Sequence, residues 1–570
     1  MDTRFASNAY RYFFIWGICA SLATTVCTIV DALLVGNLIG NHGLAVANLS
    51  TPVFLLYALV GITLGVGANV QIGRKLGAAD IPGANRIFHS LLTAGLVIGG
   101  VLLLPLLVKK AYFSFLGVTP ELYPLAERYL TVVMWSAPVF VLYHILSASV
   151  RTDSNPRLSA IASAVVILTN LSLDILFMQV LGWGIVGASA SLCIAESLGT
   201  LVLLTHFFRK RALLKWRLCL PGAKDVWQFV ANGFGIGSAN IFLAVVMLVF
   251  NGLLLRFGGD TGALYVAVYG VIYTVSTIPL AIFDGASNAL STVTSYFLGE
   301  SDTHSALSVL RKALVTVVLS GSVLAVACGC CAELLLRFFG IVDELPTAVW
   351  ALGIFAVSIP LAGVNMVVTA YWQVVGRAKL ASGFSAVRNC LVLLLAGIVL
   401  IPGGGIRGLG AAYICCEGLC LLFALTVLLL RSSKKYVLAH YSPSGRTFEE
   451  NYPIQTRSME KISADLEQLC DRWDIGMKQA FFINLICEEL LLNIIKFGIS
   501  HEHKNYYISI RLMEKDGDYV LRIRDNVHLY NPFESSGDHI DSGILKLIRM
   551  KTKYCDYQRK MIFNYLYMII

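Results

Sequence analysis

The chain has 570 residues, of which 57% are hydrophobic and only 14% are charged, and its formal net charge is +9. Soluble proteins carry about 25% charged residues, so this composition excludes an ordinary soluble fold for most of the chain. Apolar runs of about 20 residues, the length that a helix needs to cross a bilayer, recur over most of its length. We therefore predict a polytopic membrane protein.

Taken in chain order, the apolar runs predict twelve transmembrane helices. The first run contains Asp31 and is too long for the apolar core of a cleavable signal peptide, so we expect it to remain as a span. The runs lie at about residues 12–38, 44–72, 87–108, 128–150, 157–180, 184–208, 230–256, 262–296, 308–335, 347–374, 378–402 and 406–431.

The sequence of the membrane part repeats itself at a spacing of about 222 residues. The segment LGAAD at 76–80 returns as LGESD at 298–302, and GIVG at 184–187 returns as GIRG at 405–408. Internal duplication of this kind is common in membrane transporters, which hold their substrate path between the two copies. The repeat predicts two lobes of six helices each.

Three domains follow from the repeat and from a change in composition near residue 432. We predict an N-lobe at 1–220, a C-lobe at 221–435 and a cytoplasmic domain at 436–570, in which ordinary charge density returns. About twenty Lys and Arg residues lie on the side of the N-terminus and about six on the other side, so the positive-inside rule places both ends in the cytoplasm. The predicted location is the cytoplasmic (inner) membrane. The positive charge needs no nucleic-acid partner.

Polar residues inside the predicted spans indicate an ion site. Asn170 and Asp174 are four residues apart in the fifth span and therefore face the same way, and Asp31 lies deep in the first span. A carboxylate at the centre of a membrane helix costs about 2.5–3.5 kcal/mol, so these groups are expected to face the bundle. Oxygen ligands of this kind suit a proton or a small hard cation such as sodium, and the alternative is an interhelical hydrogen bond. Ser191 in the sixth span would complete the site.

The second copy lacks this cluster, so only the first lobe is expected to carry the coupling ion. Asp284 in the eighth span is a further candidate, and its neighbour Gly285 predicts a broken or bent helix there. In the second copy, Asp31, Asn170 and Asp174 correspond to Asn251, Val392 and Ala396.

The order and spacing of several motifs resemble those of the multidrug and toxic compound extrusion (MATE) transporters over about residues 8–431. The motifs are Val30-Asp31, Gly65-Val66-Gly67, Asn170-x3-Asp174 and Gly184-x2-Gly187. The resemblance implies two six-helix lobes around a central cavity and export of organic, often cationic compounds, driven by sodium or proton entry. It also implies a cation site at Asp31, Asn170 and Asp174, with Ser191 where the family has threonine.

The last part of the chain is expected to fold as an α+β sandwich. Helical patterns cover 458–472 and 476–498, and alternating patterns typical of strands begin at Tyr507 and at Tyr519. Residues 561–570 are a third strand candidate. Helices that precede a run of strands favour a sheet with its helices on one face.

This domain is similar to the GHKL-type ATP-binding fold, especially to anti-sigma-factor serine kinases. The resemblance implies that Glu489 is a general base, Asn493 holds magnesium, Asp525 reads the adenine amino group and Gly543 belongs to a lid over the phosphates. The sequence departs from that pattern because Val527 stands where glycine is expected and the paired lid glycines are reduced to one. A nucleotide site and a regulatory domain that binds a protein partner both remain open.

The sequence as a whole predicts a cation-coupled antiporter that exports small organic, cationic compounds, with a regulatory ATPase-like domain. We expect a monomer in contact with membrane lipid, and enzymatic activity of the C-terminal domain is left open. No Walker A loop is present, so an ABC-type pump is not supported. One alternative is a flippase for lipid-linked sugars, which would need inward-facing cations such as Arg388. Another is a membrane sensor that signals through the kinase-like domain.

Overall fold

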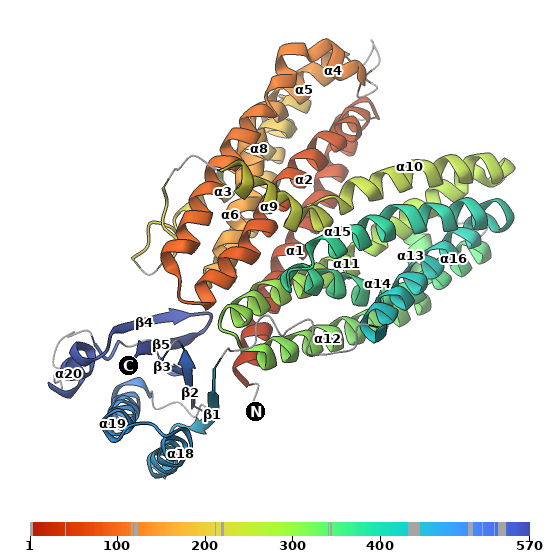
Figure 1. Cartoon of the computed structure of the whole chain (residues 1–570). Coiled ribbons are helices and arrows are strands. Elements are labelled where there is room, and N and C mark those ends of the chain that lie inside the picture. Colours follow the sequence, from red (N-terminus) through yellow and green to blue (C-terminus); the bar gives the residue numbers. More distant parts are fainter. Residues whose placement is uncertain are drawn as a thin grey trace. The chain divides into compact units, whose positions relative to one another are not determined.

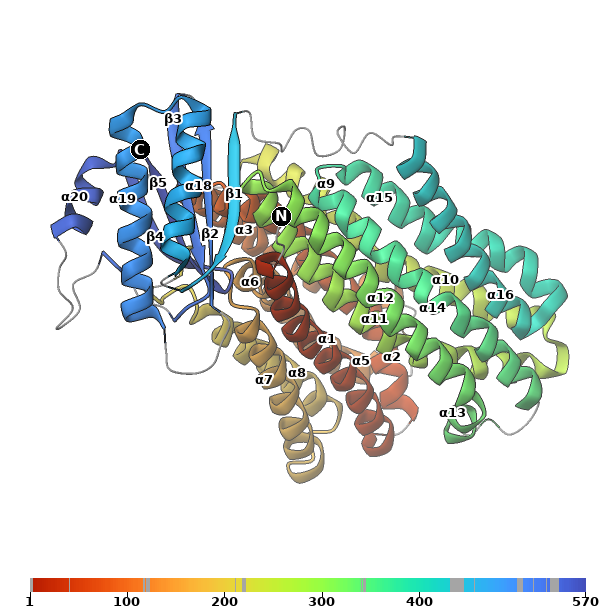
Figure 2. The same ribbon diagram turned by 90° about the horizontal axis from the view of Figure 1, so that it is seen from below.

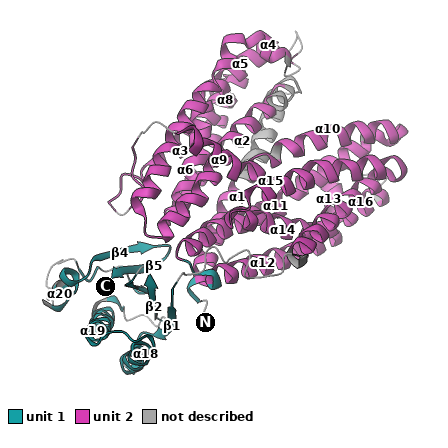
Figure 3. Cartoon of the chain, viewed as in Figure 1, with its two compact units in different colours: residues 1–5, 301–304, 441–570 teal, residues 6–300, 305–440 magenta. Residues whose placement is uncertain are grey.

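The computed structural model forms two compact units (Figure 3), one made of residues 1–5, 301–304 and 441–570 and the other of residues 6–300 and 305–440. We call them unit 1 and unit 2. The structure describes residues 4–39, 41–115, 118, 123–210, 212–217, 222–339, 341, 345–430, 445–455, 457–499, 506–515, 517–528, 531–533 and 543–570. Among these, the side chains of residues 24, 26–39, 41–45, 47–49, 115, 240, 263, 345, 428–430, 497, 543 and 546 are not described.

Unit 2 is helical, and its first half contains helices α1 to α8 (Figures 1 and 2). Two of these helices begin at a polar cap followed by proline, which is pre-organised for a first helical turn. Asp80 accepts a hydrogen bond from the Gly83 backbone at the start of α3, and Asn155 accepts one from Leu158 at the start of α7. The helices are α1 (Arg4–Ile39), α2 (Asn41–Gly77), α3 (Ile81–Val101), α4 (Lys109–Phe115), α5 (Tyr123–Trp135), α6 (Ala137–Thr152), α7 (Pro156–Asp174) and α8 (Ile185–Leu204).

The second half of unit 2 runs from α9 to α16. The last helix is interrupted at Gly405, whose φ of 55° and ψ of −131° lie outside the helical region. This interruption falls between the two final spans expected from the sequence. The helices are α9 (Ala223–Gly237), α10 (Ala239–Phe257), α11 (Gly262–Gly299), α12 (Thr303–Cys330), α13 (Ala332–Phe338), α14 (Leu345–Val374), α15 (Ala378–Ala386) and α16 (Leu393–Leu430).

The polytopic helical character expected from the sequence is confirmed. Among the residues that the structure describes, nine helices are long and apolar enough to cross a membrane, or ten if the bent pair α5 and α6 forms one span. The stretch from Ala378 to Val427 counts once in this total although Gly405 divides it. Much of α1 lies outside the described side chains, so the number twelve stays a prediction.

The backbone of unit 2 repeats at the spacing seen in the sequence. Six residues with a positive φ, which is uncommon for any residue other than glycine, form three pairs 221 or 222 positions apart. The two copies therefore share the geometry of three connecting turns. The pairs are Ala79 (58°) with Ser301 (59°), Ser154 (67°) with Gly376 (89°), and Gly184 (55°) with Gly405 (55°).

Unit 1 contains an antiparallel five-stranded sheet in the order β1-β2-β3-β5-β4. Alternate residues of the strands, such as Ile510 and Leu521, pack in one apolar core with Leu466 of α18 and Ile483 of α19. The predicted sheet domain is confirmed, although β1 and β4 were missed because their sequences are mostly polar. The strands are β1 (Thr447–Pro453), β2 (Tyr507–Lys515), β3 (Asp518–Asp525), β4 (Tyr554–Lys560) and β5 (Phe563–Ile569), and the helices are α18 (Arg457–Trp473), α19 (Met477–Asn493) and α20 (Gly543–Lys551).

Candidate functional site

The structure brings three of the predicted site residues together in the first half of unit 2. Asn170 and Asp174 lie one turn apart on α7, and both are buried. Ser191 of α8 is also buried, and its hydroxyl group donates a hydrogen bond to Oδ1 of Asp174. The same hydroxyl oxygen lies 3.4 Å from Nδ2 of Asn170, which donates to it. A carboxylate, a carboxamide and a hydroxyl group therefore meet between two helices.

Asp31, the fourth predicted member of this site, lies in α1, but its side chain is outside the described residues. Its place beside Asp174 stays a prediction.

The local backbone changes directly after Asp174. Helix α7 ends at this residue, and a π-helical turn follows over Ile175–Val180. Such turns add one residue to a helical turn and are frequent at functional sites. The second half of unit 2 also contains a π-helical turn, at Val387–Val392, which precedes Ala396, the counterpart of Asp174. The π-helical turn therefore stands at different positions in the two copies, next to the site where one copy has Asp174 and the other has Ala396.

A different polar cluster lies inside the second half of unit 2. Arg388, in the π-helical turn, donates from Nε to both carboxylate oxygens of Glu417 at 3.0 and 2.8 Å and from Nη2 to Oε1 at 2.7 Å. Asn365 of α14 donates to Oε2 of Glu417 at 2.7 Å. All three side chains are buried. The charge of Arg388 is therefore neutralised by a carboxylate of the same half.

Asp284 accepts hydrogen bonds from Ser21 of α1 at 2.9 Å and from Asn288 at 3.0 Å. Of the broken or bent helix predicted at Gly285, the break is not present, because α11 runs without interruption from Gly262 to Gly299, and the bend stays a prediction. A Cβ atom on Gly285 would lie 2.8 Å from the backbone nitrogen of Ile18. The glycine therefore allows α1 to pack closely against α11.

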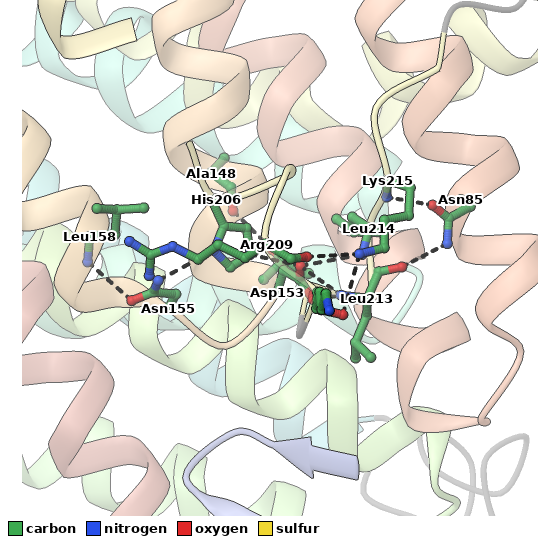
Figure 4. Close-up of polar contacts among 12 residues, drawn as sticks. Asn85, Ala148, Asp153, Asn155, Leu158, His206, Arg209, Leu213, Leu214 and Lys215 are labelled. Carbon is green, nitrogen blue, oxygen red and sulfur yellow. Dashed lines mark hydrogen bonds and ion pairs between the residues drawn. The ribbon is translucent and has the colours of Figure 1, made fainter. Parts of the chain in front are cut away.

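Sequence reasoning missed a buried pair at the ends of α6 and α8 (Figure 4). Oδ2 of Asp153 lies 2.7 Å from Nε2 of His206, and the carboxylate accepts hydrogen bonds from the backbone of Leu213 and Leu214. Burial raises the pKa of Asp153, although the contact with His206 acts in the opposite direction. The pair fastens the segment after α8 to the turn between α6 and α7. No local pattern could reveal it, because the two residues are 53 positions apart.

The residues predicted to form a nucleotide site occupy separate elements of unit 1. Glu489 and Asn493 lie one turn apart on α19, where Asn493 donates to the backbone oxygen of Glu489 at 2.7 Å. Gly543 begins α20, and residues 541–542 before it are outside the described residues.

Asp525, at the end of β3, is buried. Its Oδ1 accepts hydrogen bonds from Nδ2 of Asn564 at 2.8 Å and from the backbone of Val527 at 3.1 Å. Burial raises the pKa of Asp525 to about 7. The side chain of Val527 packs against Gly498, where an added Cβ atom would lie 2.6 Å from it. The residue that replaces the expected glycine therefore takes part in the packing next to Asp525.

Comparison with known proteins links the membrane part to one family. The MatE family model matches residues 17–176 and 236–398. The multidrug export protein MepA of Staphylococcus saprophyticus is 23% identical over 420 residues, which are 72% of this chain and 90% of that protein. MepA of Staphylococcus aureus strain MSSA476 is 23% identical over 438 residues, which are 74% of this chain and 93% of that protein.

The fold of the membrane part is also found in solved structures. One is the outward-facing conformation of a multidrug resistance MATE family transporter of the MOP superfamily, with a TM-score of 0.70 and 19% identity. The match covers 76% of this chain and 96% of that one.

Proposed function

Because the chain belongs to the MatE family of membrane transporters, we propose that it exports small organic, mainly cationic compounds in exchange for an entering sodium ion or proton. The observation that carries this proposal is the buried cluster of Asn170, Asp174 and Ser191. The similar MepA proteins are multidrug export proteins, which supports the substrate class.

The cluster has the chemistry of an ion switch. A carboxylate within a membrane is costly while it is charged, and a proton or a bound cation removes that cost. Carboxylate, carboxamide and hydroxyl oxygens are the ligands that hard cations prefer. Asp174, Asn170 and Ser191 supply one of each, and we propose that Asp31 supplies the second carboxylate.

We propose that the switch lies in the N-lobe alone. The positions that correspond to Asn170 and Asp174 in the second copy are the apolar residues Val392 and Ala396. The buried carboxylate of Glu417 in that copy already has Arg388 as its counter-charge and needs no mobile ion. The same pairing argues against a flippase for lipid-linked sugars, because the charge of Arg388 is not available to a phosphate group.

Ion entry would drive the transport cycle through this switch. When a cation reaches Asp31 and Asp174, their charge is neutralised, the helices of the N-lobe shift and the substrate is released outward. One charge that crosses the membrane contributes about 2.3 kcal/mol per 100 mV, which is enough to change the ratio of two conformations considerably. We also propose that the protein is a monomer in the inner membrane. The positive-inside rule supports a cytoplasmic location of its N-terminus and its C-terminal domain.

Ion-driven efflux in proteoliposomes tests this proposal. The full chain is reconstituted, a panel of cationic dyes is supplied, and sodium and proton gradients are imposed separately. We expect Asp174→Asn and Asp31→Asn to abolish the response to the effective gradient. Asp260→Asn, which changes an exposed carboxylate between α10 and α11, serves as the matched control and should transport like the wild type. Full ion-driven efflux by the Asp174→Asn variant would show that the proposal is wrong.

A separate proposal concerns unit 1, which would bind ATP and magnesium as a regulatory ligand. It is supported by the buried carboxylate of Asp525 at a strand end and by the position of Glu489 and Asn493 one turn apart on α19. Asp525 would hold the adenine, Asn493 the metal and Gly543 the phosphates, and Glu489 would act as the base. Calorimetric titration of the full chain with Mg-ATP tests it, with Asp525→Asn as the control. If the wild type gives no heat, the nucleotide role fails and a domain that binds a protein partner remains.

A further inference from the structure

Unit 1 contains two short segments from other parts of the chain in addition to the C-terminal residues. Besides residues 441–570, it includes residues 1–5 and residues 301–304, which are drawn in the same colour in Figure 3. Arg4 and Phe5 are the first two residues of α1, and residues 301–304 contain the end of the turn between α11 and α12 and the start of α12. The chain therefore passes between the two units at residues 5/6, 300/301, 304/305 and 440/441 rather than at a single linker.

The sheet of unit 1 has one apolar face, which α18 and α19 cover, and one polar face. Strand register places the residues of the polar face in rows across the sheet. This face is rich in cations, because its five cationic side chains outnumber its three carboxylates. The cations are Lys515, Arg511, Arg522, Arg524 and Lys560, and the carboxylates are Glu449, Asp518 and Asp556. One row contains Asp556, Tyr567, Arg522, Arg511 and Glu449, and the next contains Gln558, Tyr565, Arg524, Ser509 and Asn451.

Two of these arginines contact the segment 301–304. Arg511 donates from Nη2 to the backbone oxygen of Ser301 at 3.0 Å. Nη2 of Arg524 lies 3.5 Å from Oδ2 of Asp302 and 2.6 Å from Oε1 of Glu449. Oε2 of Glu449 also lies 3.6 Å from Nε of Arg511, so the carboxylate of Glu449 contacts two guanidinium groups. Asp302 supplies the second carboxylate that this pair of cations needs.

The same face holds Phe5. The ring of Phe5 is buried and lies edge-on to Tyr507 at 4.5 Å and to Phe563 at 4.7 Å between ring centroids. The guanidinium group of Arg524 lies 5.6 Å from the centroid of Phe5. Aromatic edge contacts and a cation over a ring are both favourable. Arg524 therefore joins Phe5 and Asp302 in one contact network.

The internal repeat shows that this contact is specific to the second copy. Asp302 corresponds to Asp80, and the residues before them share their backbone conformation. Asp80 has a local cation, because Nζ of Lys75 lies 2.7 Å from its Oδ2. Phe297 stands at the position of Lys75 in the second copy, so Asp302 lacks that local cation, and Arg524 of the sheet contacts it instead. Asp302 is buried, whereas the side chain of Asp80 is 40% exposed.

We propose that the polar face of the sheet is a docking surface for Phe5 and the segment Ser301–His304, and that docking slows transport. The inference rests on the proposed function, in which the two lobes move relative to each other. Residues 1–5 continue into a helix of the first lobe, and residues 301–304 continue into a helix of the second. A single domain that binds both segments raises the cost of any state in which those segments must separate, and it therefore acts as a brake.

Two matched variants test this inference in the full chain within lipid nanodiscs. Asparagine caps a helix as well as aspartate does, so Asp80→Asn keeps the cap of α3 and removes one charge. Asp302→Asn makes the same change at the corresponding position of the second copy. We expect Asp302→Asn to speed hydrogen exchange of the amides at 301–304 and to raise the initial efflux rate, each by about threefold or more, as for the loss of a contact between charged residues. Asp80→Asn should leave both measurements unchanged. Arg524→Gln should reproduce the effect of Asp302→Asn, and the double variant should add little to either.

The outcomes separate the parts of the inference. Equal exchange at 301–304 in the Asp302→Asn and Asp80→Asn variants would overturn the docking surface. Faster exchange with an unchanged efflux rate would overturn the brake. If the wild type shows no ion-driven efflux while the exchange rates still differ between the two variants, the proposed function fails and the docking surface stands.

Discussion

The two halves of the membrane part, α1–α8 and α9–α16, share the backbone geometry of connecting turns, but the surroundings of their buried carboxylates differ. We call these halves the first and the second lobe. In the first, Asp174 accepts a hydrogen bond from the hydroxyl group of Ser191, which in turn accepts one from Asn170. In the second, Glu417 is bound to the guanidinium group of Arg388. A membrane imposes the same electrostatic cost on both carboxylates, so the difference lies in what neutralises them. The second lobe carries its own cation, and we propose that the first receives a cation from the ion gradient.

The largest expected effect on stability comes from the removal of Arg388, the cation that pairs with Glu417. Arg388→Met leaves Glu417 buried without its partner, which costs about 3–5 kcal/mol. We expect a large fall in the thermal unfolding midpoint of the purified chain. The double variant Arg388→Met/Glu417→Met should recover much of the loss, because apolar replacements of both members are tolerated.

A matched control for this prediction is Arg337→Ala. It breaks an exposed pair with Glu333 on α13 at the same 2.7 Å distance, which is worth less than about 1 kcal/mol. If Arg388→Met proves as mild as this control, the pair does not neutralise the second lobe and the comparison fails.

Asp525 of unit 1 extends the comparison to a buried carboxylate that lies outside the membrane part. Its pKa is raised from 3.8 to about 7 by burial, so the folded state favours the protonated form. The resulting stabilisation is fully present below about pH 4 and is lost as the pH rises through about 7, with an amplitude on the order of 2–4 kcal/mol. Hydrogen exchange of the β3 amides in the full chain, corrected for intrinsic rates, measures this change.

Asp525→Asn should flatten that pH dependence, since asparagine keeps an oxygen for Asn564 and cannot ionise. A variant that retained the wild-type pH profile would show that another group is responsible.

The shared turns allow a third, smaller test. Gly184 and Gly405 adopt nearly the same conformation, with φ of 55° and ψ of −134° and −131°, which side chains rarely tolerate. Alanine at either site should cost about 1–3 kcal/mol. Gly405→Ala should cost more, because its Cβ atom would lie 3.0 Å from the ring of Tyr265, whereas nothing lies within 4 Å at Gly184. Equal midpoints in thermal unfolding would show that the turn alone decides the cost.

Local patterns in the sequence predicted the helices and the shared face of Asn170 and Asp174, because a helix fixes which residues four positions apart lie together. The sequence did not reveal the partner of Glu417, which is 29 residues away on another element. It also did not reveal that Asp302 lies beside Arg524, because that contact joins segments 222 residues apart.

Strands β1 and β4 were missed for a related reason. They lie at the edges of a sheet whose polar face carries arginine, aspartate and glutamine, so their sequences lack the apolar alternation that marks β2 and β3. A contact that depends on the tertiary arrangement produces no periodic pattern of apolar residues in the sequence, so sequence patterns cannot predict it.

The smallest expected effect is the stabilisation of the chain by a bound ion, and it tests most directly whether the two lobes differ in how their carboxylates are neutralised. If the first lobe takes a mobile ion, that ion stabilises the folded chain by mass action, which amounts to about 1.4 kcal/mol when its concentration is ten times the dissociation constant. Thermal unfolding in sodium, compared with potassium at the same pH and across a pH series, measures this gain in stability.

We expect the Asp174→Asn variant to lose the stabilisation by the ion without loss of basal stability, because asparagine retains an oxygen that can accept from Ser191. Glu417→Gln should keep the gain while its basal stability falls, because Arg388 is then left without its carboxylate. The opposite pattern, with the ion response lost in Glu417→Gln and retained in Asp174→Asn, would place the switch in the second lobe.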